Sequence, residues 1–402
     1  MKSLTESRLL LLLGAVQFVN VLDFMMVMPL GPDFAGALAI PVSHLGWIGG
    51  SYTAAAAAAG LIGSTFLDRF DRRSVLGLSL LGLSLGTLAG GFALGLKSLM
   101  AARVLAGAFG GPATSVALAI IADNIPVQRR GHALGIVMGA FSVASVLGVP
   151  AGLELARRGN FRTPFFAVSA LCLLITLCSY WVLPPQRLHL DGPKASKPAR
   201  PLGAFFADRA VSLSLANSGL SMFASFVLIP NLSTFFQHNL GYPRDQLSSL
   251  YFVGGILSFV AMRAAGAWVD RRGAGLTVGV GTALYAVNLV AGFFVTPPLI
   301  PVLVTFVVFM LASSLRNVST SSIATRVPPP AERARFMSMQ AAVQHIAASL
   351  GAILSSLLLS ESPSGALLGI RNVTLLSLTA ALAMPFLMRA LVRQVRAREA
   401  AR

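Results

Sequence analysis

Twelve long apolar runs alternate with short polar segments along the chain. A bilayer core requires about 20 consecutive apolar residues per helix, and the runs have that length. The first run is too long for the apolar part of a signal peptide and contains Asp23 and Pro29, so we expect it to be retained. The pattern predicts an all-α membrane protein with twelve transmembrane helices, near residues 9–30, 43–66, 74–96, 99–122, 132–155, 163–183, 210–236, 246–269, 275–296, 299–325, 336–358 and 368–388.

The composition supports a membrane protein and argues against an enzyme. Only 11% of the 402 residues are charged and 55% are hydrophobic, whereas a soluble domain carries about 25% charged residues. Both cysteines, Cys172 and Cys178, fall inside one apolar run, which implies no disulfide framework and no metal site. No phosphate-binding loop and no cluster of nucleophile, base or metal ligands stands within the runs. We therefore expect no enzymatic activity and no cofactor.

The net charge of +17 comes from basic residues whose distribution along the chain predicts its orientation in the membrane. If the N-terminus is cytoplasmic, 22 of the 31 Lys and Arg residues fall on the inner side and six on the outer side. This asymmetry predicts cytoplasmic termini in a bacterial-type inner membrane. The excess positive charge then meets anionic lipid, so nucleic acid is not an expected partner.

The chain divides into two halves that contain similar motifs. Residues 184–209 are polar, basic and proline-containing, and we predict them to be a cytoplasmic linker between six-helix halves at 1–183 and 210–402. The segment Leu67-Asp68-Arg69-Phe70-Asp71-Arg72-Arg73 follows the second run, and Asp270-Arg271-Arg272-Gly273 follows the eighth. Asp68 and Asp270 are 202 residues apart, about half the chain. Paired repeats of this kind are typical of transporters.

Four motifs in consistent order carry a resemblance to a known family. They are the two Asp-Arg loop segments, Arg103 followed by Gly107 in the fourth run, the series Gly139, Gly148, Pro150 and Gly152 in the fifth, and Leu22-Asp23-Phe24 before Pro29-Leu30 in the first. The chain resembles the major facilitator superfamily, in particular its twelve-span drug:proton antiporter and arabinose-efflux-like branch. The first loop copy departs from the family pattern, since both of its glycines are replaced. The resemblance implies two pseudo-symmetric halves, transport by alternating access and a monomer.

Asp23 is the leading candidate for proton coupling. A carboxylate inside a span is costly unless it is paired, hydrated or protonated, so it indicates a functional site by default. Gln17, Asn20 and Asp23 recur at three-residue spacing and lie near one helix face. The resemblance suggests Arg103 as the partner of Asp23. The alternative is a static ion pair that holds two spans together.

Further polar and aromatic residues within the spans are candidates for the wall of a substrate cavity. Gln340 and Gln344 share a helix face beside the protonatable His345, and Arg316 has no acid near it in the sequence. Arg316 therefore requires either an anionic substrate or a distant carboxylate. For every candidate the alternative is helix bridging or core packing. The set comprises Gln17, Asn20, Phe24, Met26, Tyr52, Asn231, Asn288, Arg316, Asn317, Gln340, Gln344 and His345.

The remaining motif residues have two interpretations: a role in transport, which the resemblance implies, and a simpler role in topology or packing. Asp68, Arg69, Arg72, Arg73, Asp270 and Arg271 resemble cytoplasmic gate elements, or they are only a topology signal. Gly139, Gly148, Pro150 and Gly152 resemble the glycine series of antiporters, or they only allow close helix packing.

Together these features predict a proton-coupled exporter of a small molecule such as a drug, sugar or metabolite. The proton is the expected coupling ion, and the lipid bilayer and the transported solute are the expected partners. Two alternatives stay open: a facilitator or proton-symport importer of the same fold, and a non-transporting receptor built on a transporter scaffold. The scarcity of acids within the spans favours a neutral or anionic substrate.

Overall fold

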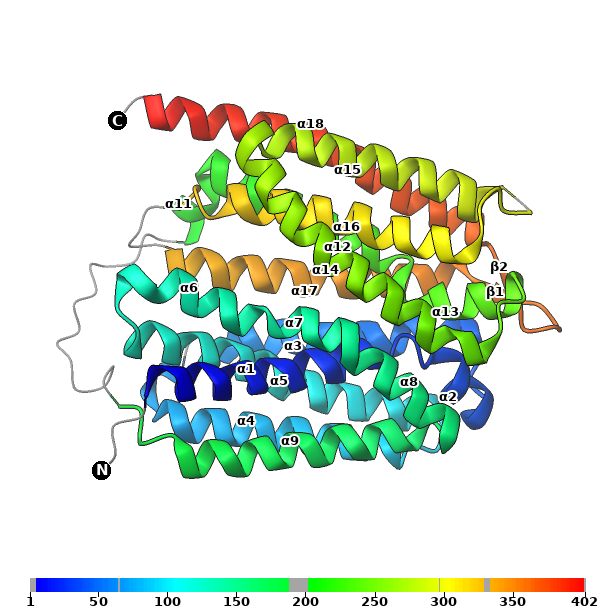
Figure 1. Cartoon of the computed structure of the whole chain (residues 1–402), viewed down its shortest axis with the longest axis horizontal. Coiled ribbons are helices and arrows are strands. Elements are labelled where there is room, and N and C mark those ends of the chain that lie inside the picture. The colour runs from blue at the N-terminus through cyan, green and yellow to red at the C-terminus, as the bar shows by residue number, and fades with distance from the viewer. Residues whose placement is uncertain (1–4, 64–65, 188–201, 296, 329–332, 401–402) are drawn as a thin grey trace. The chain divides into compact units, whose positions relative to one another are not determined.

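Long α-helices make up most of the protein. The computed structural model describes residues 5–63, 66–187, 202–295, 297–328 and 333–400 (Figure 1). Within these ranges, 12 helical segments are long and apolar enough to cross a membrane. The predicted all-α fold with twelve spans is therefore confirmed. The predicted linker at 184–209 lies mostly outside the described residues.

The contacts divide the chain into two compact units. The first contains residues up to Pro41 and from Trp47 to Ala195, and the second contains Val42–Gly46 and the residues from Ser196 onward. The sequence-based division had placed residues 42–46 in the first half. In the second unit the Glu361 carboxylate accepts a hydrogen bond from the Val42 N–H at 2.9 Å.

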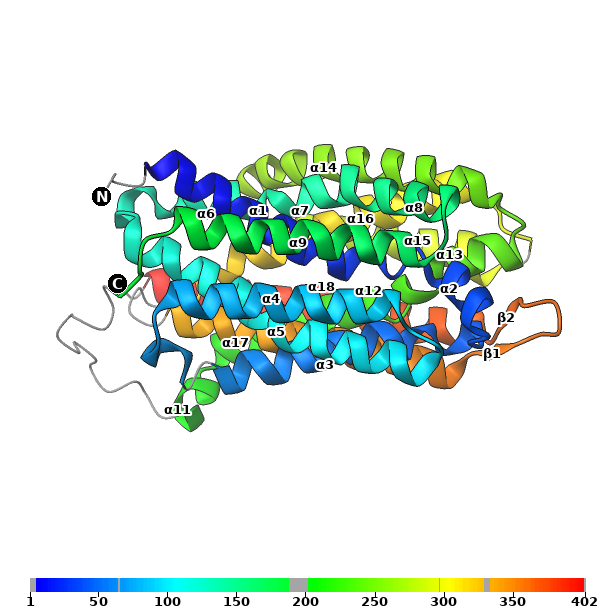
Figure 2. The same ribbon diagram turned by 90° about the horizontal axis from the view of Figure 1, so that it is seen from below.

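The first unit is built around α4, which packs against α5 and α9 (Figures 1 and 2). Small residues allow the approach to α5, since a methyl group at Gly86 would lie 2.5 Å from the backbone nitrogen of Ala106. Ser84 and Ser169 exchange hydrogen bonds between α4 and α9. The elements of this unit are α1 (Glu6–Met26), α2 (Gly31–Leu38), α3 (Leu45–Gly63), η2 (Leu67–Arg69), α4 (Arg72–Gly91), α5 (Leu96–Asn124), α6 (Val127–Met138), α7 (Ala140–Val143), η3 (Ala144–Gly148), α8 (Val149–Arg158) and α9 (Arg162–Val182).

In the second unit, α12 packs against α17 and α18, while α16 packs against α14 and α15. A short antiparallel hairpin pairs Ser360 with Leu368 and Glu361 with Leu367. The elements of this unit are η1 (Val42–His44), α11 (Leu202–Ala207), α12 (Arg209–Phe226), η4 (Ile229–Asn231), α13 (Leu232–Thr234), η5 (Phe235–Asn239), η6 (Arg244–Gln246), α14 (Leu247–Arg272), α15 (Ala274–Leu289), η7 (Val290–Phe294), α16 (Val302–Ala324), α17 (Arg333–Leu358), β1 (Ser360–Glu361), β2 (Leu367–Leu368) and α18 (Ile370–Ala400).

Two predicted spans are interrupted by proline. The first helix ends at Met26 rather than near residue 30, since Pro29 cannot continue the helical hydrogen bonding and α2 starts afresh at Gly31. The seventh run, predicted at 210–236, breaks after Phe226, and Pro230 lies in the 3₁₀ turn that follows. In these two runs the apolar length therefore overestimates the continuity of the helix, whereas Pro112 lies inside the continuous helix α5.

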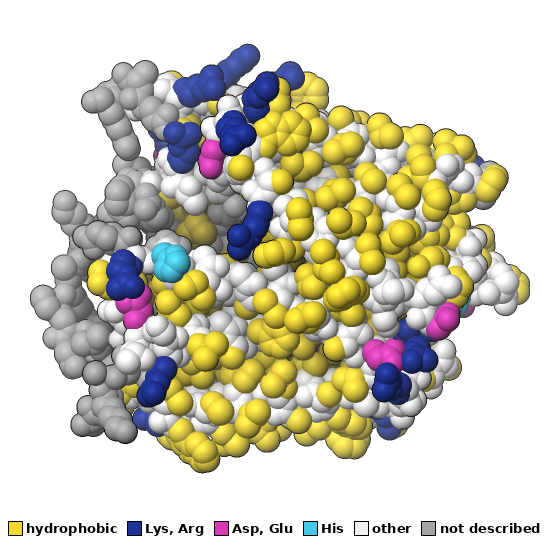
Figure 3. Space-filling model, in the orientation of Figure 1, with side chains coloured by type: hydrophobic (Ala, Val, Ile, Leu, Met, Phe, Trp, Pro, Cys, Tyr) yellow, Lys and Arg dark blue, Asp and Glu magenta, His cyan; other side chains and the backbone are white. Residues whose placement is uncertain are grey.

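The outward-facing side chains are those expected of helices in lipid. Leu78 on α4 and Phe386 on α18 are 62% and 69% exposed, although both are large and apolar. On the face shown in Figure 3, hydrophobic side chains cover the helices along most of their length, and basic side chains gather near helix ends. In a soluble protein an apolar surface of this extent would indicate an interface. Here it fits the hydrocarbon core of a bilayer.

Candidate functional site

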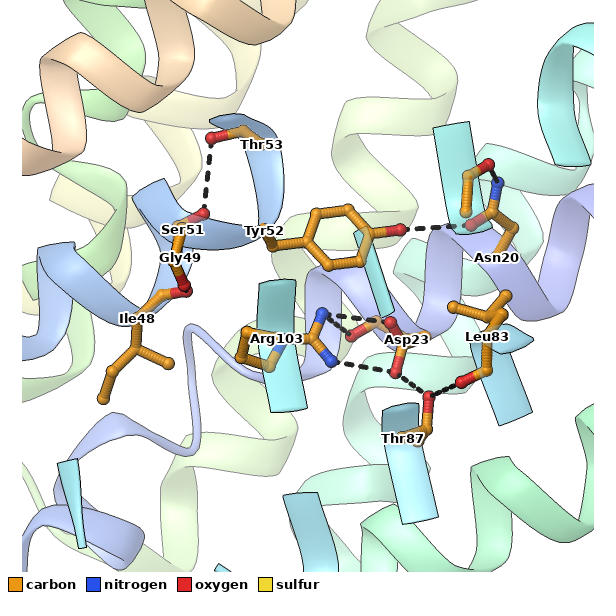
Figure 4. A network of polar contacts seen from close by, with 11 residues as sticks. Asn20, Asp23, Ile48, Gly49, Ser51, Tyr52, Thr53, Leu83, Thr87 and Arg103 are labelled. Atoms are coloured by element: carbon orange, nitrogen blue, oxygen red, sulfur yellow. Dashed lines mark hydrogen bonds and ion pairs between the residues drawn. The ribbon is translucent and has the colours of Figure 1, made fainter. Parts of the chain in front are cut away.

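A buried ion pair joins α1 to α5 in the first unit. Asp23 is 0% exposed and Arg103 is 1% exposed. The Arg103 Nη1 donates to Asp23 Oδ1 at 3.0 Å, and Nη2 donates to Oδ2 at 3.0 Å and to the Asp23 backbone oxygen at 3.4 Å (Figure 4). This side-by-side geometry is the strong, charge-assisted form of the interaction. The structure therefore brings together the two residues predicted as the proton-coupling pair.

Neighbouring helices complete the hydrogen bonding of the carboxylate. The Thr87 hydroxyl on α4 lies 2.6 Å from Asp23 Oδ1 and 2.8 Å from the Leu83 carbonyl oxygen, and its one proton serves either acceptor. The ring of Tyr52 lies under the Arg103 guanidinium, whose carbon is 4.5 Å from the ring centroid. Thr87 was not among the predicted residues, because hydroxyl side chains are common in apolar helices and give no sequence signal by themselves.

Asn20 connects the same network to a second position on α5. Its Nδ2 donates to the Gly110 carbonyl at 2.9 Å and to Thr114 Oγ1 at 2.6 Å, while its Oδ1 accepts from the Tyr52 hydroxyl at 3.1 Å. Phe24 stacks on Tyr52 with 5.2 Å between ring centroids. Four of the predicted residues, Asn20, Asp23, Phe24 and Tyr52, thus share one network with Arg103. Gln17 is buried on the same helix, and its Oε1 has no hydrogen-bond partner.

The glycine that follows Arg103 by one helical turn has a steric explanation. A methyl group at Gly107 would lie 2.2 Å from the Tyr52 backbone oxygen, and one at Gly110 would lie 2.4 Å from the Tyr52 hydroxyl. Only glycine allows α5 to approach α3 closely enough for the Tyr52 ring to reach Arg103. The Arg-Gly motif of the fourth run therefore positions the ion pair.

A single buried salt bridge compensates the charge of Asp23 in this arrangement. In the ionised form the Asp23 carboxylate accepts from Arg103 and Thr87 in a water-excluded environment. A proton on the carboxyl group would cancel its charge and leave a guanidinium buried without a counterion, which is costly. The structure shows the paired arrangement, and Arg103 Nε is a buried donor with no hydrogen-bond partner in the part of the chain that the structure describes.

The glycine series of the fifth run lies partly against α1. A methyl group at Gly148 would lie 2.7 Å from Leu22 Cδ1, and one at Gly152 would lie 3.7 Å from Met26 Cβ. Pro150 follows a π-helical turn at Ala144–Gly148, which accommodates the ring without a helical break. Gly139 contacts only carbonyl oxygens of its own helix. Met26 is buried, and its Cβ faces Gly152 of α8.

The predicted cavity residues of the second unit mostly bind serine hydroxyls. Asn231 donates to Ser355, Gln340 to Ser218 and Arg316 to Ser225, while Asn317 accepts from Ser221, with donor–acceptor distances of 2.7, 3.0, 3.0 and 3.0 Å. These bonds bridge helices. Gln344 and His345 are half-buried, and Asn288 is buried with neither side-chain polar atom paired.

The first Asp-Arg loop holds together the helix ends of its own unit. Arg72 Nε lies 2.8 Å from Asp123 Oδ2, and the Arg73 guanidinium donates to the Tyr180 carbonyl oxygen and lies over the Tyr180 ring. Asp71 caps α4 by accepting from the Arg73 N–H, and it also accepts from the Gln186 N–H. Partial burial acts to raise the pKa of Asp71, but these bonds and Arg187 hold it below its usual range.

The second Asp-Arg loop has a different local structure. Gly273 has a φ of +83° and ends α14, a conformation that favours glycine. The first copy has Asp71 at the equivalent place and uses it as a helix cap, which explains how that copy tolerates the loss of the glycine. Arg69, Asp270 and Arg271 are exposed, and the Asp68 side chain lies outside the described residues.

Two further features bear on chemistry. Glu154 forms ion pairs with Arg157 and Arg158, both at 2.6 Å, near the C-terminal end of α8. Among the described residues no group of three or more His, Cys, Asp and Glu side chains is arranged to hold a metal ion.

Comparisons with known proteins agree with the helical architecture. A sequence model of the Major Facilitator Superfamily matches residues 13–262 and 214–402. The chain is 30% identical over 187 residues to multidrug resistance protein 2 of Bacillus subtilis (strain 168), which covers 45% of this chain and 46% of the relative. It is 27% identical over 270 residues to the chloramphenicol resistance protein of Streptomyces lividans, covering 66% and 67%. The first of these alignments spans about half the length of the curated relative.

One solved structure extends the similarity of fold over nearly the whole chain. The crystal structure of a bacterial homolog to the human lysosomal transporter Spinster, in an inward-facing and occupied conformation, superposes with a TM-score of 0.70. The superposition covers 98% of this chain and 95% of the other at 18% sequence identity. At this identity the likeness concerns the fold alone.

Proposed function

The chain belongs to the Major Facilitator Superfamily and is a multi-pass membrane transporter rather than an enzyme; from this premise we propose that it exports a small molecule in exchange for protons by alternating access. We further propose that it works as a monomer in a bacterial-type inner membrane with both termini cytoplasmic. The relatives named for multidrug and chloramphenicol resistance support export as the direction.

The buried Asp23–Arg103 pair is the observation that carries this proposal. Asp23 is the only acid deep inside a described span, and Arg103 compensates its charge directly. A proton taken up by Asp23 from the outer side releases Arg103 and favours one conformation. Loss of that proton on the inner side restores the pair and resets the transporter. One carboxylate with one counterion therefore suffices for the exchange.

A second candidate function uses the same residues without a proton. The Asp23 carboxylate is fully hydrogen-bonded by Arg103 and Thr87, which fits a permanent structural pair. In that case the protein is a facilitator that moves its solute down a concentration gradient.

Transport in proteoliposomes separates the two candidates. A panel of drugs, sugars and metabolites, with chloramphenicol among them, first identifies a solute to which cells expressing the protein become less sensitive. An imposed pH gradient should then drive uphill movement of that solute with the wild type and not with Asp23→Asn. Glu154→Gln is the matched control, because it removes a carboxylate paired with arginine at an exposed helix end. If Asp23→Asn still gives uphill, pH-driven transport, the proton role of Asp23 is wrong.

A further inference from the structure

The second unit buries an arginine that no carboxylate among the described residues compensates. Arg316 on α16 is 0% exposed. Its Nη2 donates to Ser225 Oγ at 3.0 Å, while Nε and Nη1 are buried donors without hydrogen-bond partners among the described residues. The adjoining helices α12, α15 and α16 contain no Asp or Glu, and the single acid of α18, Glu399, stands at its C-terminal end. Arg103 in the first unit, by contrast, meets Asp23 directly.

An aromatic ring holds the guanidinium in place without neutralising it. The Arg316 guanidinium carbon lies 3.9 Å from the centroid of the Tyr285 ring. The Tyr285 hydroxyl is anchored 3.0 Å from the Ala224 carbonyl oxygen and 2.9 Å from Ser377 Oγ. A cation over a ring gains some attraction but keeps its full charge and most of its donors. The side chain is therefore pre-positioned and still lacks an anion.

More unpaired polar groups lie on the helix that faces Arg316. A methyl group at Gly281 of α15 would lie 3.2 Å from Arg316 Cγ, so α15 and α16 meet here. Gly281, Tyr285 and Asn288 follow at helical spacing and share one face of α15. Asn288 is 1% exposed, and within the described ranges neither its Nδ2 nor its Oδ1 has a hydrogen-bond partner. A purely structural arginine bridge would satisfy these donors, because buried polar groups in folded proteins are nearly always paired.

We propose that Arg316 is the binding site for the carboxylate of a monoanionic organic solute, with Asn288 as an additional donor to it. This inference rests on the proposed function, since it names the class of solute that is transported. One negative charge cancels the single charge of Arg316, whereas a doubly charged phosphate would leave one uncompensated. The guanidinium fork also matches the two oxygens of a carboxylate better than it matches a neutral carbonyl. Because no solvent reaches Arg316 in this conformation, the solute enters in another conformation of the cycle.

Ligand-induced thermal stabilisation of the purified full-length protein in detergent tests this site without a proton gradient. The probes are aromatic and aliphatic monocarboxylates, including benzoate, each compared with its neutral amide, such as benzamide. A chloride titration forms a separate arm, because an inorganic anion offers the same charge. We expect at least one carboxylate to raise the Tm saturably with an affinity at least tenfold higher than that of its amide, about 1.4 kcal/mol.

Three variants localise the effect. Arg316→Gln should lose the preference for the carboxylate, and Arg316→Lys should keep part of it because the charge remains. Arg263→Gln is the matched control, since Arg263 lies on α14 of the same unit, is exposed and stacks on Phe259. The wild-type comparison of acid with amide remains decisive even if Arg316→Gln does not fold.

Defined outcomes overturn the inference. It is wrong if no carboxylate binds better than its amide, if Arg316→Gln keeps the preference, or if chloride alone saturates the site and excludes the carboxylates. Asp23→Asn separates this inference from the proposed function, because it should keep carboxylate binding while losing pH-driven transport. If wild-type transport proves uncoupled from protons while carboxylate binding depends on Arg316, only the proton exchange is refuted.

Discussion

Removing one member of the Asp23–Arg103 pair should destabilise the protein more than removing both. The relevant variants are Asp23→Asn, Arg103→Gln and the double variant. Both side chains are at most 1% exposed, so no water replaces the lost partner. A buried charge that loses its partner costs about 3–5 kcal/mol, whereas two neutral amides in the same space cost about 1–3 kcal/mol. The coupling free energy of the cycle should therefore be at least about 3 kcal/mol, because the costs of the two single variants together exceed the cost of the double variant by at least that much.

The two single variants should also differ from each other. In Asp23→Asn the guanidinium stays charged, because arginine does not lose its proton in proteins. In Arg103→Gln the carboxyl group can take up a proton and avoid a buried charge, and Thr87 still lies 2.6 Å from it. Asp23→Asn should therefore be the more damaging change.

Reversible unfolding by a denaturing detergent in mixed micelles measures these free energies. The control cycle uses Glu154→Gln and Arg157→Gln, an exposed pair that should contribute at most about 1 kcal/mol. The reasoning is refuted if the effects of the two buried variants add, or if Asp23→Asn costs no more than Glu154→Gln.

Two further predictions concern helix contact and a loop carboxylate. Gly107→Ala should lower the free energy of unfolding by about 1–3 kcal/mol, because its methyl group would lie 2.2 Å from the Tyr52 backbone oxygen. Gly14→Ala, which has open space around it, should be neutral or stabilising. Equal unfolding midpoints for the two variants would contradict the close approach of α5 to α3. The pKa of Asp71 is lower in the folded state than in the unfolded state, where it is about 3.9. The ionised carboxylate therefore stabilises the fold fully above the unfolded-state pKa, and this stabilisation is lost as the pH falls through the lower folded-state pKa. Acid unfolding followed below about pH 4 should accordingly be shallower for Asp71→Asn than for the wild type.

The site was only partly predictable from the sequence. Asp23 stands out because a carboxylate inside an apolar run is rare and needs a reason. Its partner Arg103 was predicted from a family motif, because the pattern of apolar and polar residues does not reveal contacts between residues 80 positions apart. Thr87 and Ser225 gave no signal, because hydroxyl residues are frequent in membrane helices. Asp71 replaces a motif glycine, and its role as a helix cap depends on the backbone around it.

The sequence by itself determined the class of fold and the presence of charged side chains within the spans, where burial of a charge costs free energy. Apolar length, sparse charge and the distribution of basic residues require helices in lipid, because unpaired backbone groups are not tolerated there. Tertiary structure alone decided which of these groups are compensated. Helices far apart in the chain bring Arg103 against Asp23 and leave Arg316 with a ring and one hydroxyl. Direct pairing of a buried charge requires hydrogen-bond distance of about 3 Å, so it depends on which helices touch and not on the order of residues.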